Sequence, residues 1–453
     1  MPQPDHRTRL KQWLESGEIR LQPLTFPQRE LWEASPHPPE DASNNIGAII
    51  HLRGPLTPQG SEAALRKVIE RQEVFRLSFL PGKTQPVQMI RNTAEPVLEF
   101  REIAASAQSA EALDERTALI FQQPFDLVQG PLYRAEVLRL APDDHLLVLA
   151  IHHAIADGWT LGVFVQDLFN AYLQTLKGTH SALPRVPLSY SEWGAAERAL
   201  WQPAEIERRA AYWRAELADA PRLWNRRTGP DTVSGSLQRH VSHIPAGLGR
   251  SLRELARRNG ATLFSTLLTA FQIALSKWTD AEDIVVGTPV ANRNSQAVRE
   301  TMGYCSGIVP LRGRIDPARP FTNSLKIVHQ SAQDAFANAM PFAELVRAVG
   351  DAAAPGYNPV FEVRFALQNH PVPDVEVAGL SLRLRTRSTG TARFDLACEI
   401  NEEKDLLEVS WLSRQNLFRQ DAVEDLARSY LAVLNAACHS PDGVPADPLP
   451  ALR

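Results

Sequence analysis

Two adjacent histidines at the end of an apolar run are the residues of this chain best placed to do chemistry. They are His152 and His153 in the stretch LAIHHAIADGW, residues 149–159, which also holds Asp157 and Gly158. An imidazole with its ordinary pKa of about 6.5 can accept or hold a proton at working pH. A carboxylate followed by glycine suits the start of a helix, where it can also bind a cationic side chain. The same residues could equally be a buried polar pair that ends a strand and starts a helix.

The strand that carries the histidines limits what they can do together. Side chains alternate along a strand, so His153 shares a face with Ile151 and His152 faces the other way. We therefore expect one histidine to be structural, and we expect His153, the last residue before the loop, to face a cavity. Two opposed histidines and one aspartate do not supply three convergent ligands, which argues against a metal site. No serine or cysteine stands in an elbow-like context, which argues against a nucleophilic triad.

Strands and helices are expected to alternate around this motif. Residues 132–140 and 145–153 have the pattern of a hairpin around a turn at 141–144. Apolar residues recur three or four apart over 161–172, which predicts an amphipathic helix directly after the motif. Further helices are expected at 62–70, 203–218, 261–278 and 420–436, and strands at 283–290, 359–367, 393–400 and 405–412.

An internal similarity suggests that the chain contains two related halves. DLFNAYLQTL at 167–176 resembles DLARSYLAVL at 425–434, and the same offset places strand 148–153 on 406–411. At that offset, His152, His153 and Asp157 fall on Ser410, Trp411 and Gln415. If the halves are related, the fold does not require the histidines, which favours a specific task for them.

Bulk composition excludes several classes of protein. With 453 residues, 44% hydrophobic and 22% charged, the chain is expected to form two lobes rather than one core. A net charge of −4 without blocks of like charge predicts no nucleic-acid partner. Three scattered cysteines give no disulfide framework or zinc site, and a cytoplasmic location is expected. The amino terminus has no apolar signal core and no apolar run is long enough to span a membrane.

The motif and several ordered segments resemble one known family. HHAIADG at 152–158 is similar to the His-His-x-x-x-Asp-Gly signature of condensation domains from nonribosomal peptide synthetases. Other matches cover nearly the whole chain in the same order: LTFPQRELW at 24–32, RQEVFRLSF at 71–79, YSEW at 190–193, YWRAEL at 212–217, DIVVGTPVANR at 283–293, MGYCSGIVPLR at 302–312, NPVFEVRFALQN at 358–369 and TARFDL at 391–396.

The chain also departs from the family pattern. Gln72 stands where histidine is usual, and Gly307 and Ile308 stand where polar residues are usual. The sixth motif, ANAMPFAELV at 337–346, keeps Pro341 and Phe342 but lacks the customary His-Gln before them and the glutamate after them. These departures concern the acceptor side and the subtype, and they leave the histidine motif intact.

The resemblance implies an α/β fold of two chloramphenicol-acetyltransferase-like lobes. The lobes would form a V-shaped pseudo-dimer with the active site in a tunnel between them. Residues 1–180 would form the N-terminal, donor-side lobe that carries the histidine motif. Residues 190–453 would form the C-terminal lobe, with a crossover strand near 385–400, which TARFDL resembles.

The resemblance also assigns roles to individual residues. His153 would accept the proton of the nucleophile or hold it in position, and the N–H of Gly158 would lie near the developing oxyanion. His152 would be structural, and Asp157 would pair with Arg293, whose fork suits a carboxylate.

Two further residues match positions near the substrate. Trp159 would line the cavity, although it could instead belong to the helix core. Asn358 lies near the active site in the family, although an asparagine before Pro359 could be only a turn residue. Arg293 taken alone could likewise be a solvated loop arginine.

The implied substrates are thioesters. A donor acyl group would arrive on phosphopantetheine, from an acyl carrier or peptidyl carrier protein or from acyl-CoA, and an aminoacyl amine would attack it to form an amide. No tightly bound cofactor is implied, and the isolated domain is expected to be monomeric. Because residues 1–23 precede the first motif and no adenylation or carrier segment is present, we expect a first domain or a free-standing enzyme. A first domain would act as a starter that acylates the first amino acid with a fatty acyl group.

Three alternatives remain open from the sequence. One is a free-standing condensation enzyme that forms an amide or ester with a soluble amine or alcohol. Another is an epimerisation domain, whose additional glutamate motif is not seen here. The third is a non-catalytic recruitment module, in which the histidine motif is usually degraded, whereas here it is whole.

Overall fold

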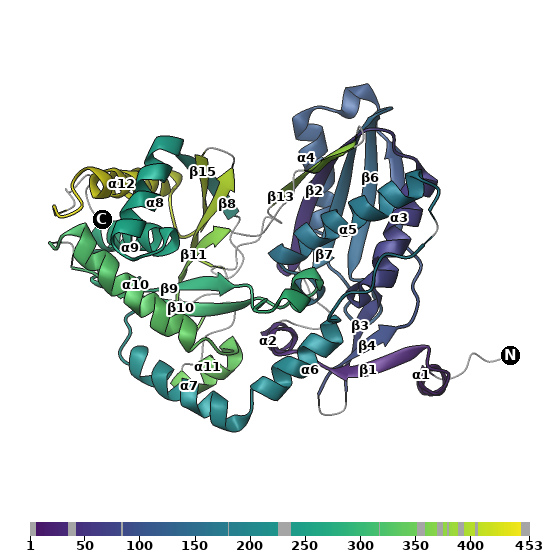
Figure 1. Ribbon diagram of the computed structural model, residues 1–453, viewed down its shortest axis with the longest axis horizontal. Helices are drawn as coiled ribbons and strands as arrows, with labels where there is room; N and C mark the ends of the chain where they lie inside the picture. Colours follow the sequence, from purple (N-terminus) through teal and green to yellow (C-terminus); the bar gives the residue numbers. More distant parts are fainter. Residues whose placement is uncertain are drawn as a thin grey trace. The chain divides into compact units, whose positions relative to one another are not determined.

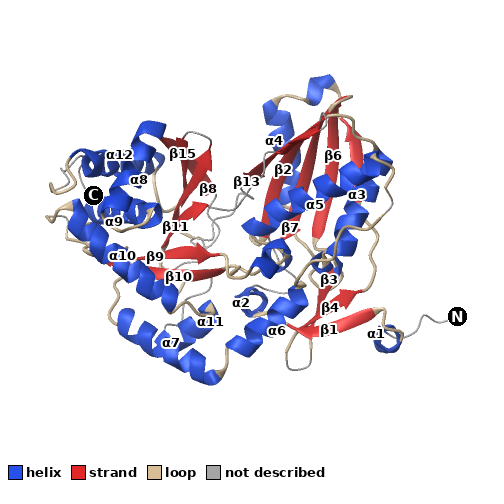
Figure 2. Cartoon of the chain, in the orientation of Figure 1, coloured by secondary structure: helices blue, strands red, loops and turns tan. Residues whose placement is uncertain are grey.

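The computed structural model describes residues 6–34, 42–82, 85–179, 181–224, 237–316, 318–350, 358–368, 375–377, 380–387, 394–403 and 406–444. The chain divides into two compact units (Figures 1 and 2). Unit 1 takes in Met1–Trp201, Ala291–Ser306 and His370–Thr389, and unit 2 takes in Gln202–Val290, Gly307–Asn369 and Gly390–Arg453. Both units combine helices with a central sheet, which confirms the α/β class expected from the sequence.

Unit 1 is built on a mixed sheet. Among the described residues its strand order is β12-β13-β2-β7-β6-β5. The strands are β2 (Asn45–Arg53), β5 (Leu98–Glu102), β6 (Tyr133–Ala141), β7 (Asp144–His152), β12 (Val375–Val377) and β13 (Leu380–Arg387). The pairs β2–β7, β6–β7 and β13–β2 are antiparallel, and β5 runs parallel to β6.

Helices cover both faces of this sheet. The helices of unit 1 are α1 (His6–Glu15), α2 (Phe26–Ala34), α3 (Pro58–Arg71), α4 (Ala110–Phe121), α5 (Gly158–Leu176) and α6 (Tyr190–Leu200). Helices α3 and α5 lie against each other on one face, and α4 packs on the opposite face, where the Phe121 ring lies against Gly47 of β2 (Figure 1). A second, small sheet has the order β1-β4-β3 and contains β1 (Ile19–Pro23), β3 (Leu77–Leu80) and β4 (Val87–Arg91).

Unit 2 is also a mixed sheet covered by helices. Its described strand order is β10-β9-β11-β14-β15-β8. The strands are β8 (Leu237–Ile244), β9 (Asp283–Val290), β10 (Gly307–Arg314), β11 (Val363–Gln368), β14 (Leu396–Glu403) and β15 (Leu406–Arg414). The helices are α7 (Pro203–Glu216), α8 (Ala246–Arg258), α9 (Leu263–Thr279), α10 (Phe321–Ala337), α11 (Phe342–Val349) and α12 (Gln420–His439).

The two sheets share a four-stranded arrangement. In unit 1, β2 and β6 flank β7 antiparallel to it and β5 lies parallel to β6; in unit 2, β8 and β14 flank β15 antiparallel to it and β11 lies parallel to β14. Helix α5 follows β7, as α12 follows β15. The internal similarity seen in the sequence therefore joins equivalent strand–helix segments, which supports a duplicated architecture.

The division of the chain differs from the one expected, residues 1–180 and 190–453. Helix α6 belongs to unit 1 because Tyr190 and Glu197 bond to Thr25 and Phe26 at the start of α2. Residues 291–306 also belong to unit 1, although they lie far along the chain. The strand expected near 385–400 is found earlier: β13 joins β2, while β14 begins only at Leu396. Residues 388–393 of that expected strand lie outside the described residues.

None of the helices in the described part of the chain has the length and apolar character needed to span a membrane. Helix α12 reaches 20 residues, but its first half carries the charged residues Asp421, Glu424, Asp425 and Arg428.

Candidate active site

The two histidines sit at the junction of a strand and a short helix. Strand β7 ends at His152, and residues His153–Ile155 form a 3-10 turn, η3. Nδ1 of His152 accepts the N–H of Ala154 at 3.2 Å, so the imidazole caps this turn. The ring is 1% exposed and lies edge-on to Phe125. His152 thus occupies the buried position, with its side chain engaged by its own turn.

His153 lies in a more open environment. Its side chain is half-buried, and its N–H donates to the carbonyl of Asn44 at 2.7 Å. The imidazole makes an edge contact with the ring of Tyr304, whose centroid is 4.3 Å away. Strand alternation alone does not place this side chain, because the strand has already ended at His152.

Asp157 starts the helix that follows. Its Oδ1 accepts the N–H of Thr160 at 3.0 Å, and the Thr160 hydroxyl accepts the N–H of Asp157, which completes a capping box at the start of α5. Its Oδ2 lies 2.7 Å from Nη1 of Arg293, the partner expected from the sequence. Oδ2 also accepts the N–H groups of Cys305 and Ser306, each at 3.1 Å.

Both charges of this ion pair are kept despite burial. Burial raises the pKa of Asp157, but Arg293 and the hydrogen bonds from Thr160 and Cys305 outweigh it and leave the pKa below its ordinary value. Burial lowers the pKa of Arg293, and Asp157 reverses this effect. The guanidinium also donates to the carbonyls of Thr301 and Gly303. Arg293 is therefore a buried structural cation and not a solvated loop arginine.

Gly158 and Trp159 form the first turn of α5. As the first helical residue, Gly158 carries an N–H without a partner inside the helix, at the positive end of the helix dipole. The indole N–H of Trp159 donates to the carbonyl of Arg299 at 2.9 Å, and the Arg293 guanidinium lies over its ring. Trp159 therefore packs on residues 291–306.

Asn358 belongs to unit 2 and acts in its own turn. Its side-chain oxygen accepts the N–H groups of Val360 and Phe361 at 2.9 and 3.1 Å. Its carbonyl accepts a hydrogen bond from Arg222. The structure thus shows that Asn358 stabilises its own turn, and its position near a substrate stays a prediction.

Gln72 replaces the usual histidine without leaving polar atoms unused. Its amide N–H groups donate to Asp167 and to the carbonyl of Glu300, and its oxygen accepts the N–H of Met302. An amide suits this place because it offers donors and an acceptor together. Gln72 thereby fixes residues 291–306 onto α3 and α5.

Sequence reasoning missed several residues around His153. They are Asn44, Thr160, Gly303 and Tyr304. Gln28, which the sequence marks as a scaffold residue, donates to the carbonyl of Ala154 at 3.0 Å. Gln28 and Tyr304 lie within two of the segments that resemble family motifs, and that was the only sequence signal for them. Their contacts depend on distant segments, which local patterns do not reveal.

Other nucleophiles and ligands near the motif are buried or dispersed. The thiol of Cys305 is buried, and burial raises its pKa, so it is not poised as a thiolate nucleophile. Within the ranges that the structure describes, no three His, Cys, Asp or Glu residues lie close enough to hold a metal ion.

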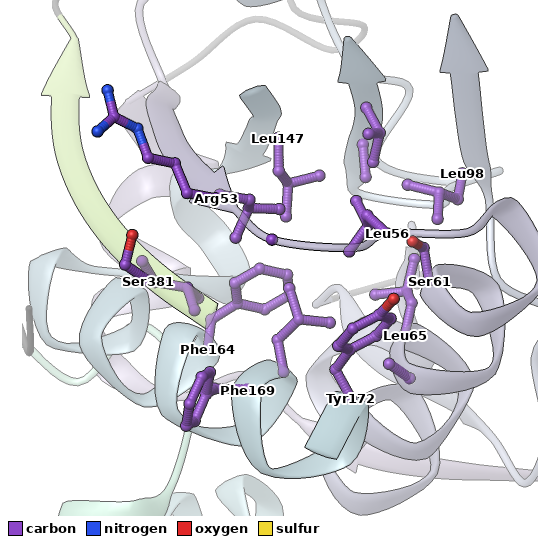
Figure 3. Close-up of a pocket in the computed structure, with 17 residues that line it drawn as sticks. Arg53, Leu56, Ser61, Leu65, Leu98, Leu147, Phe164, Phe169, Tyr172 and Ser381 are labelled. Atoms are coloured by element: carbon purple, nitrogen blue, oxygen red, sulfur yellow. The ribbon is translucent and has the colours of Figure 1, made fainter. Parts of the chain in front are cut away.

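A small apolar cavity lies elsewhere in unit 1, between the sheet and helices α3 and α5 (Figure 3). It has a volume of about 40 Å³, and its walls include Leu52, Leu147, Ala135 and Phe164. A cavity that binds benzene has a volume of about 150 Å³, so this much smaller one is not sized for an acyl chain. Leu147 is also near the start of β7, whereas His152 is its last residue and His153 follows it. The cavity is a packing void apart from the candidate site.

Comparison with protein families identifies the family to which the histidine motif belongs. The model of the condensation domain matches residues 18–447. The chain belongs to the condensation domain family. Among sequence relatives, the condensation domain described here is 32% identical over 431 residues to one of the linear gramicidin synthase proteins of Brevibacillus parabrevis, and 33% identical over 394 residues to phosphinothricin tripeptide synthetase PhsC from Streptomyces viridochromogenes.

These matches cover 92% and 84% of this condensation domain but only 6% and 36% of the two synthetases. The chain therefore corresponds to a small part of each relative. Solved structures share its fold. The first condensation domain of the calcium-dependent antibiotic synthetase has a TM-score of 0.81 at 20% identity, covering 96% of this chain and 99% of that one. The X-domain in its complex with OxyB from teicoplanin biosynthesis has a TM-score of 0.81 at 23% identity, covering 94% and 96%.

Proposed function

We propose that this condensation domain transfers an acyl group from a phosphopantetheine thioester to the amine of an aminoacyl acceptor, forming an amide in nonribosomal peptide or lipopeptide synthesis. The observation that carries the proposal is a difference between neighbours in the motif. His153 is half-buried, while His152 and Asp157 are buried and held by their own turn and by Arg293. His153 is thus the titratable residue of the motif that can meet a substrate without rearrangement.

The reaction does not require this imidazole to act as a strong base. The amine nitrogen attacks the thioester carbonyl, a C–N bond forms, the C–S bond breaks, and the leaving sulfur takes up the proton that nitrogen loses. A neutral, aligned aliphatic amine attacks a thioester readily. His153 therefore holds the amine in position, accepts the proton that the nitrogen loses, and passes it to the leaving sulfur. Positioning of this kind can contribute more than the roughly 10²- to 10⁴-fold typical of general-base catalysis. A hydroxyl acceptor would depend on the base more.

The start of α5 supplies the complementary charge. Negative charge develops on the carbonyl oxygen as the amine attacks, and a helix amino terminus with an unused N–H stabilises such charge. Gly158 is the residue at that position. The neighbouring carboxylate of Asp157 does not oppose this, because Arg293 neutralises it at 2.7 Å.

The donor is proposed to be carried by an acyl carrier or peptidyl carrier protein, with acyl-CoA as a further source. The finer proposal is a starter role, in which a fatty acyl group is joined to the first amino acid. It is supported by likeness in fold to a condensation domain that is the first of its synthetase. An aminoacyl or peptidyl donor would indicate an internal position instead.

Product analysis by mass spectrometry tests the function directly. Fatty acyl, aminoacyl and peptidyl thioesters on a carrier protein, and the fatty acyl-CoA, are each offered with an aminoacyl-carrier acceptor, a soluble amine or a soluble alcohol. Amide on the carrier-bound acceptor supports the proposal, and preference for fatty acyl donors supports the starter role. Product only with the soluble amine or alcohol would indicate the free-standing enzyme. An acceptor of inverted stereochemistry, without a new amide, would indicate epimerisation.

A recruitment module is the second candidate. It is favoured by likeness in fold to the X-domain, which was solved in complex with OxyB. The intact histidine motif and the half-buried His153 favour a catalytic role over recruitment alone. Stable binding of a partner protein with no product from any donor and acceptor pair would establish recruitment in its place.

A further inference from the structure

We propose that Gln28 is a positioning residue for the proposed reaction, because its amide holds the backbone of the turn that carries His153. This inference rests on the proposed function for its kinetic consequence, whereas the hold on the turn can be tested without any substrate. Nε2 of Gln28 donates to the carbonyl of Ala154, the residue after His153, at 3.0 Å. Gln28 lies on α2, so the bond joins the turn to a helix from a distant part of the chain.

The turn, η3, relies on side chains as well as on its own backbone. Within it, the N–H of Ala156 donates to the carbonyl of His153 at 3.3 Å. The peptide groups of Ala154 bond to side chains instead: its N–H donates to Nδ1 of His152 at 3.2 Å, and its carbonyl accepts from Gln28. Ala154 is 1% exposed, so loss of the Gln28 donor would leave a buried carbonyl in need of a partner.

A capping box fixes the side chain of Gln28. The hydroxyl of Thr25 accepts the N–H of Gln28 at 3.3 Å, and Oε1 of Gln28 accepts the N–H of Thr25 at 3.1 Å. Thr25 is 0% and Gln28 1% exposed. Because Oε1 is bonded to an N–H and the other end of the amide meets a carbonyl, the two partners determine which end carries the nitrogen.

A second buried amide lies beside this one. Gln88 of β4 is 0% exposed, and its Nε2 donates to the carbonyl of Pro23 at 2.8 Å. Its Oε1 lies 3.5 Å from Nε2 of Gln28. A glutamine amide has two N–H donors, so Gln28 can serve Ala154 and Gln88 together. Gln28 thereby links α2, β4 and η3 through one side chain.

The bond to Ala154 requires an amide, whereas the capping box does not. A glutamate would also accept the N–H of Thr25, since glutamate and glutamine both complete a capping box. An ionised glutamate has no donor for the carbonyl of Ala154, and a protonated one has a single donor. Gln28→Glu therefore separates the support of α2 from the support of η3, and pH changes the second without removing the first.

Loss of this bond should lower the rate more than it weakens substrate binding. The bond acts on the peptide group that directly follows His153, so a shift of the turn moves the point from which that side chain starts. Misplacement of a catalytic group by about 1 Å can lower a rate about 10²-fold. This effect on the backbone is independent of what the imidazole itself contacts.

Hydrogen–deuterium exchange tests the hold on the turn without substrate. Gln28→Met removes the amide at similar size, and Gln108→Glu is the matched control, because Gln108 donates to the carbonyls of Ile103 and Leu140 instead. Exchange in the peptide covering 153–156 is expected to rise about tenfold in Gln28→Met and to stay at the wild-type rate in Gln108→Glu. Unchanged exchange there in Gln28→Met, or an equal rise in Gln108→Glu, overturns the proposal.

The kinetic arm compares each variant with the wild type at the same pH, using a donor and acceptor pair that the wild type turns over. Gln28→Met is expected to lower kcat about tenfold at every pH, with KM changed by less than about twofold. Burial raises the pKa of a carboxyl group above its ordinary value of about 4.3. Gln28→Glu is therefore expected to approach the wild-type kcat in acid and to fall to about a tenth of it as the pH rises.

Charged and titratable groups on the surrounding elements are the same in every variant, among them Arg29 of α2, Arg91 of β4, Glu197 and Arg198 of α6, and His153 of η3. Burial raises the pKa of Glu197, which accepts the N–H of Phe26, to about 7, so the ratio to the wild type is needed to cancel its titration.

Two kinetic results would overturn the role of Gln28. Wild-type kcat in Gln28→Glu at every pH would mean that only the capping box matters. Equal losses in Gln28→Glu and Gln28→Met at every pH would mean that a donor to Ala154 is not what the turn needs. If the wild type forms no product, the proposed function fails, and the exchange result still decides whether Gln28 holds the turn.

Discussion

Asp157 and Arg293 form a buried ion pair although they are 136 residues apart in the chain. Asp157 ends the loop after the histidines, and Arg293 belongs to the distant segment that completes unit 1. The pair therefore attaches residues 291–306 to the start of α5. Its side chains are only 1% and 3% exposed, so neither charge is hydrated when its partner is lost.

Removing one partner should destabilise the protein strongly. Asp157→Ala leaves Arg293 buried without its counter-charge, a change that typically costs about 3–5 kcal/mol. Urea unfolding should show this loss, together with lower soluble yield. The double variant Asp157→Ala/Arg293→Met should recover part of it, because the unpaired charge is gone. An Asp157→Ala variant as stable as the wild type would contradict this account of the pair.

The same pair has a defined pH dependence. The pKa of Asp157 is lower in the folded protein than the ordinary carboxyl value of about 3.9. Its contribution is therefore complete above about pH 4 and is lost as the pH falls through the lowered value. Stability measured at pH 7 and pH 5 should differ by the same amount in the wild type and in Asp157→Asn, because the pair is intact at both values in the wild type. A loss confined to the wild type between these pH values would show that the pKa of Asp157 is raised instead.

His145 should make the protein less stable in mild acid. Its ring is buried beside Phe100, and neither ring nitrogen has a hydrogen-bond partner among the described residues. Burial, together with Arg139, lowers its pKa. The unfolded chain therefore takes up a proton at about pH 6.5 that the folded chain does not, and stability falls as the pH drops below that value.

Replacing this histidine should reverse the effect. His145→Leu fills similar space without polar atoms, and it is expected to raise the free energy of unfolding by about 1–3 kcal/mol at pH 7. Its advantage over the wild type should grow between pH 7 and pH 5.5. His243→Leu, which replaces an exposed histidine, is measured beside it as the surface control. A constant difference between His145→Leu and the wild type over this range would show that His145 does not titrate as described.

The cavity in unit 1 should accept a larger side chain. Ala135 lines this space of about 40 Å³, and Ala135→Val adds two carbon atoms to it. Thermal or urea unfolding should show a gain of about 1 kcal/mol. Ala48→Val is the matched control: Ala48 is fully buried on β2, which is separated from β6 by β7, and it does not line the cavity, so overpacking should cost about 1–3 kcal/mol. Equal losses in both variants would mean that the void is already closed in solution.

Local patterns predicted the elements around the motif closely. The hairpin expected at 132–140 and 145–153 is β6–β7, and the strand expected at 283–290 is β9. The strand expected at 359–367 begins later, at Val363, because Asn358 turns the backbone before it. Hydrophobic periodicity and helix-capping signals involve residues close together in the chain. A single sequence is therefore enough to predict helices and strands from them.

The parts that escaped prediction depend on contacts between distant residues. No local signal shows that β13 pairs with β2, or that residues 291–306 belong to unit 1. The contact between Tyr304 and His153 is of the same kind. Resemblance to the family predicted the pairing of Asp157 with Arg293, but the hydrogen bonds that Asp157 accepts from the N–H groups of Cys305 and Ser306 required coordinates.

The most direct test of the central claim is the rate of His153→Ala with a carrier-bound acyl donor and an aminoacyl acceptor, measured as amide formed per unit time. We expect turnover to fall roughly 10²- to 10⁴-fold, while unfolding stays cooperative at nearly the wild-type midpoint. His152→Ala should instead lose stability, because His152 caps the buried turn. Full wild-type turnover in His153→Ala, above all with a weakly nucleophilic acceptor, would contradict the role of this imidazole in catalysis.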